Sequence, residues 1–148
     1  MLNIIVILTA IAQGLVGLFV YQKKKDSLSN ILFGVLSLGS LSWALSNYFY
    51  TLNPTAESAL QIIRIIMFFV VVQNSIFFMF AQIYPSSKLT IPKKRIAVFM
   101  MLSLVVAVMT LTPLVFRSVT VSDNQSNPNP GPLIPIFALH AIYSIGTI

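Results

Sequence analysis

The chain has 148 residues, of which 57% are hydrophobic and 8% are charged, whereas about 25% of the residues of an ordinary soluble domain are charged. So few charges cannot coat a water-facing surface, which argues against a soluble enzyme, a disordered tail or a free nucleic-acid-binding module. Nine Lys and Arg against three Asp and Glu give a formal net charge of +6, and there is no Cys. Disulfides and cysteine metal sites are therefore excluded.

Apolar segments long enough to cross a bilayer recur along the chain. A helix of about 20 apolar residues spans a hydrocarbon core of about 30 Å. Four segments reach that length, at about 2–21, 31–52, 60–84 and 96–116. Their central stretches carry no formal charge and lack the alternation of barrel strands. We therefore predict an all-α fold class, a polytopic bundle of transmembrane helices that forms one region over 1–148.

The connections between these segments contain helix breakers and caps. Thr55 is a predicted N-cap for the third helix, and Glu57 lies in its first turn, where a negative charge meets the helix dipole favourably. Pro113 lies about one turn before the predicted end of the fourth helix, where proline kinks a helix or loosens its backbone hydrogen bonds. Residues 117–132 are polar and rich in turn formers, so we expect an exposed loop.

A fifth apolar run, 133–148, has 16 residues and extends to the last residue of the sequence. This length is short for a full span, and the run carries no basic or aromatic residue after it. We therefore expect four full spans plus a partial fifth, in a chain that is truncated at its C-terminus.

The basic residues predict the orientation in the membrane. Seven of them fall in the first and third connections: Lys23, Lys24, Lys25, Lys88, Lys93, Lys94 and Arg95. The second and fourth connections hold Glu57 and Asp123. Since basic loops remain in the cytoplasm, we predict a multi-pass protein of the plasma membrane with its N-terminus outside.

The sequence contains no catalytic constellation, so we predict neither an enzyme nor a cofactor or metal site. His140 is the single histidine, and its own predicted helix holds no Asp or Glu. A lone membrane histidine can relay protons or bind a ligand. It can equally be hydrogen-bonded inside the bundle, and the sequence favours this simpler interpretation.

Several intramembrane polar residues are candidates for a ligand-sensing surface. The set comprises Trp43, Asn47, Arg64, Asn74 and His140. For each there is a structural alternative: polar residues on one helical stripe let helices pack, and a terminal arginine can snorkel to the headgroups or clamp an anionic ligand. Ala10, Gly14 and Gly17 form a small-residue stripe that predicts a helix contact.

The order of features resembles that of a known family. The second helix carries Trp43, the third opens with Arg64, and the motifs Thr112-Pro113-Leu114-Val115 and Gly131-Pro132-Leu133 flank the last polar loop. In this the chain resembles the N-terminal seven-transmembrane region of bacterial sensor histidine kinases, over its first four to five helices. The resemblance implies the sensory input region of a two-component system. It also implies an unknown small ligand, a cytoplasmic output domain outside this chain, and a homodimer formed through that domain.

Two other classes of membrane protein fit the same pattern. A transporter or channel subunit would line its pathway with these polar groups, although no acidic residue lies in a predicted span and coupled ion transport commonly uses one. A small membrane assembly protein would use the polar stripes only to pack helices. In every case the lipid bilayer is a partner and nucleic acid is not.

Overall fold

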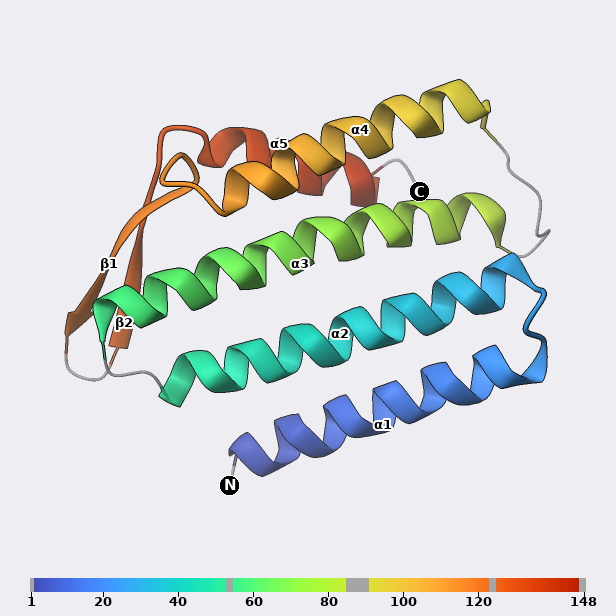
Figure 1. Ribbon diagram of the computed structural model, residues 1–148, viewed down its shortest axis with the longest axis horizontal. Helices are drawn as coiled ribbons and strands as arrows, with labels where there is room; N and C mark the ends of the chain where they lie inside the picture. The colour runs from blue at the N-terminus through green and yellow to red at the C-terminus, as the bar shows by residue number, and fades with distance from the viewer. Residues whose placement is uncertain (1, 53–54, 85–90, 123–124, 147–148) are drawn as a thin grey trace.

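The computed structural model describes residues 2–52, 55–84, 91–122 and 125–146, and within them it places five helices and one β-hairpin. The elements in chain order are α1 (Leu2–Lys23), α2 (Leu28–Leu52), α3 (Ala56–Ile83), α4 (Lys93–Thr110), β1 (Phe116–Ser122), β2 (Gln125–Pro130) and α5 (Ile134–Gly146). The five helices predicted from the apolar runs are confirmed. Consecutive helices run antiparallel, and the hairpin lies at the end of the bundle where α3 begins (Figure 1).

Helix α3 is the centre of the arrangement. It packs against α2 on one side, against α4 and α5 on the other, and against β1 at its N-terminal end. Helix α1 lies at the edge of the row and packs mainly against α2 (Figure 1). Thr55 caps α3 as predicted, because its hydroxyl accepts a hydrogen bond of 3.3 Å from the backbone N–H of Ser58.

The small-residue stripe of α1 faces α2, as predicted. A Cβ added to Gly17 would lie 2.3 Å from the Cβ of Ser37, so only glycine permits this approach. Asn30 strengthens the same contact, since its Nδ2 donates to the carbonyl of Val20 at 2.9 Å. Close backbone packing is the usual way in which helices associate in lipid.

The distribution of polar side chains is that of a membrane bundle. The buried polar residues include Ser37, Ser75, Ser103, Thr110, His140 and Ser144, while large apolar side chains are exposed all along α1 and α4. Most buried hydroxyls return to their own helix: Ser75, for example, donates to the carbonyl of Val71 at 2.7 Å. Because apolar residues on the outside suit lipid and not water, the chain is a multi-pass membrane protein.

Among the residues that the structure describes, three helices are long and apolar enough to cross a membrane: 4–23, 28–50 and 56–83. The expectation of four full spans is thus confirmed for three, and α5 is a shorter apolar helix. Helix α4 has 18 residues, and three of them are the basic residues of its first turn. Its apolar part is therefore shorter than the predicted segment.

The predicted extension of the fourth helix to residue 116 is wrong. The helix ends at Thr110, with Leu111 as its C-cap. Pro113 explains the end, because a proline ring clashes with the carbonyl four residues earlier and disfavours helical backbone at the preceding residue. Proline terminates the helix here instead of kinking it.

The polar stretch predicted as a loop forms an antiparallel hairpin. The register pairs Phe116 with Pro130 and Ser118 with Asn129, so Arg117 is an extra residue in a β-bulge. Side chains alternate along a regular strand, and the bulge shifts this alternation by one residue. As a result Phe116 and Val119 are both buried.

Two buried clusters hold the hairpin and the last helices against α3. The first joins Ala59 and Ile63 of α3 with Val115, Phe116 and Val119. The second lies further along α3 and joins Val71 to Val106 and Ala107 of α4. Phe137 of α5 packs against both clusters, so α5 is placed by the hairpin and by α4 together.

Candidate functional site

The segment after α4 and the segment before α5 meet at the base of the hairpin. The backbone N–H of Gly131 donates to the carbonyl of Val115 at 2.7 Å, and that of Leu133 donates to the carbonyl of Leu114 at 2.9 Å. A Cβ on Gly131 would lie 2.2 Å from the carbonyl oxygen of Leu114. The two sequence motifs singled out above are therefore one structural unit, and glycine is required where they touch.

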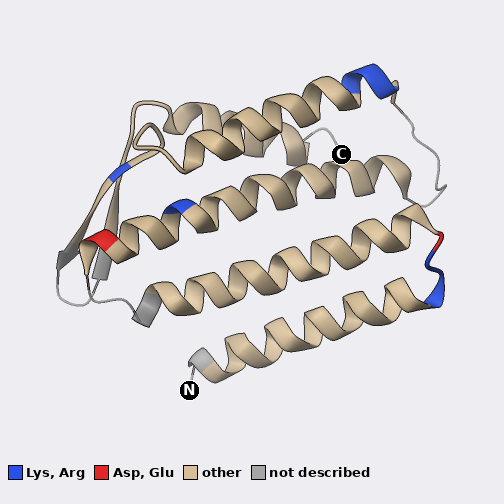
Figure 2. Ribbon diagram, viewed as in Figure 1, with Lys and Arg blue, Asp and Glu red and all other residues tan. Residues whose placement is uncertain are grey.

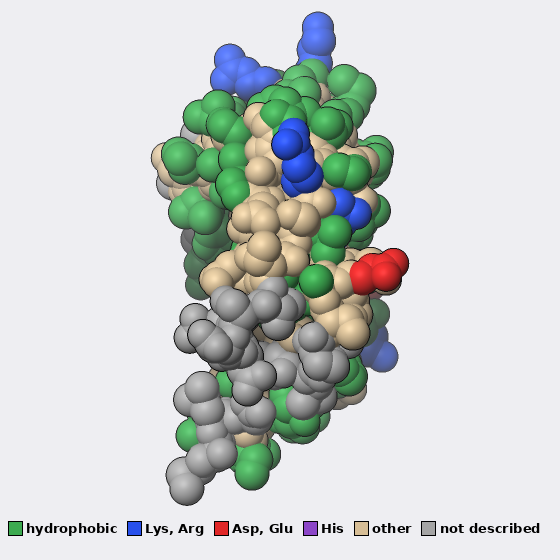
Figure 3. Space-filling view, turned by 90° about the vertical axis from the view of Figure 1, so that its left-hand side faces the viewer, with side chains coloured by type: hydrophobic (Ala, Val, Ile, Leu, Met, Phe, Trp, Pro, Cys, Tyr) green, Lys and Arg blue, Asp and Glu red, His purple; other side chains and the backbone are tan. Residues whose placement is uncertain are grey.

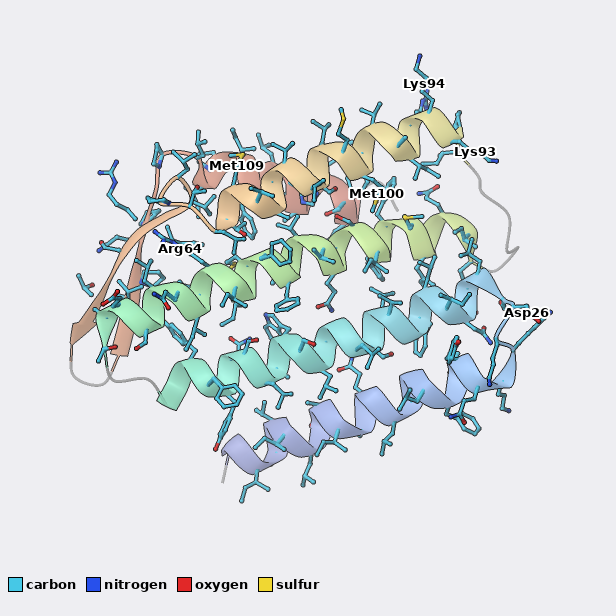
Figure 4. The ribbon with its side chains drawn as sticks, viewed as in Figure 1. Asp26, Arg64, Lys93, Lys94, Met100 and Met109 are labelled. Carbon is cyan, nitrogen blue, oxygen red and sulfur yellow. The ribbon has the colours of Figure 1, made fainter. Side chains whose placement is uncertain are left out.

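Arg64 ties this unit to α3. Its Nη2 donates to the carbonyl oxygen of Phe116 at 2.8 Å, and its Nε is buried without a hydrogen-bond partner. Phe116 is paired with Pro130, which has no N–H to offer, so this carbonyl is open to another donor. Figure 4 shows Arg64 between α3 and the hairpin.

Trp43 and Asn47 form a second, local pair on α2. The Nδ2 of Asn47 donates to the carbonyl of Trp43 at 2.8 Å, within one turn of the same helix. Trp43 is 44% exposed. Trp43 therefore lies partly on the outer surface of α2.

Asn74 is half-buried on α3, about 15 Å further along the helix than Arg64 at 1.5 Å per residue. Its neighbour in the sequence makes the interhelical contact at this level. Gln73 donates through Nε2 to the hydroxyl of Ser40 on α2 at 2.8 Å. Asn74 is thus separate from the hairpin base.

His140 lies between α4 and α5 and is 9% exposed. Its Nε2 is 2.8 Å from the hydroxyl oxygen of Ser103, which itself donates to the carbonyl of Phe99 at 2.8 Å. Since the single hydroxyl hydrogen is engaged there, we assign the ring hydrogen to Nε2. Nδ1 is then a buried acceptor without a partner. The ring also stacks on Phe99, with centroids 5.6 Å apart.

The structure brings Arg64 to the hairpin and leaves the other candidates apart from it. His140 stacks on Phe99, whose ring lies 4.4 Å from that of Phe78 on α3. Phe78 lies about 21 Å along α3 from Arg64. Sequence reasoning missed Phe116 and Ser103, and it noted Gly131 only as part of a motif. A glycine after a turn-rich segment was a usable signal for Gly131. Phe116 acts through its backbone carbonyl, and Ser103 acts through a contact with His140, 37 residues away in the sequence, so neither gives a local signal.

In the part of the chain that the structure describes, no group of three His, Cys, Asp or Glu could hold a metal ion. The end of the molecule that carries the hairpin shows basic and acidic side chains among uncharged side chains and backbone, with apolar side chains around them (Figure 3).

The comparisons identify one match. The model of the family described as the N-terminal 7TM region of histidine kinase matches residues 5–148. This range includes every helix except the first residues of α1. No curated protein and no solved structure matches the chain.

Proposed function

The chain belongs to the family of N-terminal seven-transmembrane regions of histidine kinases, and from this premise we propose that it is the sensory input region of such a kinase. In this proposal the region lies in the plasma membrane with the N-terminus and the hairpin outside, and it passes a stimulus to a cytoplasmic output domain. A homodimer through that domain would be the signalling unit. Membership of the family favours this function over a transporter or an assembly subunit.

The observation that carries the proposal is the link between Arg64 and Phe116. A guanidinium hydrogen bond of 2.8 Å joins the central helix to the hairpin, next to the buried cluster around Ile63 and Val119. A ligand that binds at the hairpin and competes for the Phe116 carbonyl, or for the Nε–H of Arg64 that has no partner, would change how the hairpin packs on α3. A stimulus acts by favouring one of two nearby arrangements of a protein.

The positions of the basic residues and of the hairpin support the proposed orientation. The basic residues after α1 and at the start of α4 lie at one end of the bundle, and the hairpin lies at the opposite end (Figure 2). The positive-inside rule assigns the basic end to the cytoplasm. The hairpin would then face the exterior, and Trp43, Asn47 and Asn74 would lie between the two ends along α2 and α3.

The test is kinase activity of the full-length protein in lipid nanodiscs. We expect Arg64→Ala to change the autophosphorylation rate by at least about threefold, in either direction, because the hydrogen bond would be lost from only one of the two arrangements. Arg117→Ala is the matched control, since Arg117 is the exposed neighbour of Phe116. Equal rates for the wild type, Arg64→Ala and Arg117→Ala would refute coupling between the hairpin and the kinase.

A further inference from the structure

A groove runs between α4 and α5. Its volume is about 700 Å³, which is within the range of pockets that hold small ligands. The walls are mainly apolar and include Val98, Leu102, Val106, Ile136 and Leu139. The hydrogen bond between Ser103 and His140 holds the two helices together along it.

One end of the groove is basic. Lys94 and Arg95 line it there, and Figure 4 shows Lys94 pointing away from the bundle. Neither α4 nor α5 contains an acidic residue. A ligand that fits this surface has an anionic head and an apolar tail.

The start of α4 adds to the attraction for an anion. Lys93, Lys94 and Arg95 occupy its first turn, and Pro92 provides no side-chain cap. Basic side chains at a helix N-terminus oppose the helix dipole, which favours negative charge there. An anion at this end would meet the basic side chains and the positive end of the helix dipole together.

The length of the groove matches one membrane leaflet. From Arg95 to Val106 the helix rises about 16 Å, and half of a hydrocarbon core of about 30 Å is about 15 Å. Leu102 is 54% exposed and Leu139 is 65% exposed, so both side chains are available to an apolar tail. A single acyl chain would lie along the groove with its headgroup at the basic end.

From these features we propose that the α4–α5 groove is a binding site for one anionic glycerophospholipid. The phosphate is held by Lys94 and Arg95 at the start of α4. One acyl chain lies between Leu102 and Leu139. This inference does not depend on the sensory function proposed above.

The test uses the full-length protein in nanodiscs and two photoreactive lipid probes with a diazirine in the acyl chain. One probe is phosphatidylglycerol and the other is phosphatidylcholine. We expect phosphatidylglycerol to label peptides of 98–106 and 136–143 about tenfold more than phosphatidylcholine, because two basic residues act on the headgroup. The double variant Lys94→Ala with Arg95→Ala should remove this preference, and Leu102→Trp should reduce labelling by both probes because it fills the groove.

The matched control is the double variant Lys24→Ala with Lys25→Ala. These lysines lie at the same end of the bundle but do not line the groove, so the preference should persist. Equal labelling of the groove by the two probes in the wild type would overturn the proposal, and so would the same loss in both double variants. Protein would cover the groove if neither probe labelled it and if Leu102→Cys formed a disulfide with a cysteine introduced on another helix or on a second copy. This result would also overturn the proposal.

Discussion

The Nη2 atom of Arg64 lies 2.8 Å from the carbonyl oxygen of Phe116, across a separation of 52 residues in the sequence. Phe116 is paired in the hairpin with Pro130, and proline cannot donate a backbone hydrogen bond. The cation on α3 thus satisfies a carbonyl that the sheet leaves open. In an environment with little water, this pairing stabilises both groups.

Arg64→Ala is expected to lower the free energy of unfolding by about 1.5–3 kcal/mol, the usual contribution of a hydrogen bond to a charged group. The measurement is unfolding by sodium dodecyl sulfate in mixed micelles. Arg117→Ala should stay within about 0.5 kcal/mol of the wild type, since exposed substitutions rarely do more. If the two variants unfold alike, the contact with Phe116 does not stabilise the fold.

Gly131→Ala is expected to destabilise the hairpin base strongly. The new Cβ would lie 2.2 Å from a backbone oxygen of Leu114 and 2.5 Å from its carbonyl carbon. Backbone cannot yield as a flexible side chain does, so the two motifs must separate. We expect a loss of more than about 2 kcal/mol, measured in the same unfolding experiment.

Gly39→Ala is the control for the Gly131 variant. Its Cβ would meet Gln73 at 3.8 Å, an ordinary contact, and alanine is favoured over glycine inside a helix by up to about 1 kcal/mol. We expect its stability to be unchanged or slightly raised. A Gly131→Ala variant as stable as Gly39→Ala would show that the turn at Gly131 tolerates a side chain.

The sequence predicted the helices well because length and apolar composition alone decide which segments cross a bilayer. It did not reveal the hairpin, since β2 consists of Gln, Ser, Asn and Pro residues and shows no alternation of apolar side chains. It also placed Pro113 within a helix, although proline can equally end one. Of the candidate site, the sequence identified Arg64. It could not identify the partner of Arg64, because that partner is a backbone carbonyl and every residue type has one.

The orientation is testable by cysteine labelling, because residues 1–148 contain no Cys. Thr120→Cys in β1 should react with a membrane-impermeant maleimide in intact cells. Lys24→Cys, at the opposite end of the bundle, should react only after the membrane is permeabilised, as the positive-inside rule requires. Both side chains are exposed, so access to the reagent differs only by the side of the membrane. The reverse pattern would place the N-terminus in the cytoplasm.

The contact between Ser103 and His140 is expected to show strong non-additivity. Ser103→Ala leaves both ring nitrogens of His140 without a partner, since Nδ1 already lacks one. An unsatisfied buried polar group costs about 1–3 kcal/mol, whereas replacing both partners by apolar groups can be nearly neutral. The double variant Ser103→Ala with His140→Phe should therefore be more stable than Ser103→Ala alone, and its phenyl ring can retain the stacking on Phe99.

Ser144→Ala is the matched control for this cycle. Ser144 is equally buried, but its hydroxyl donates to the carbonyl of His140 in its own helix at 2.8 Å. The loss of an intrahelical bond leaves no side chain of another helix unpaired, so the effect should be below about 1 kcal/mol. Equal effects of Ser103→Ala and Ser144→Ala would mean that the hydrogen bond between α4 and α5 contributes nothing measurable. A double variant as unstable as the sum of its single changes would lead to the same conclusion.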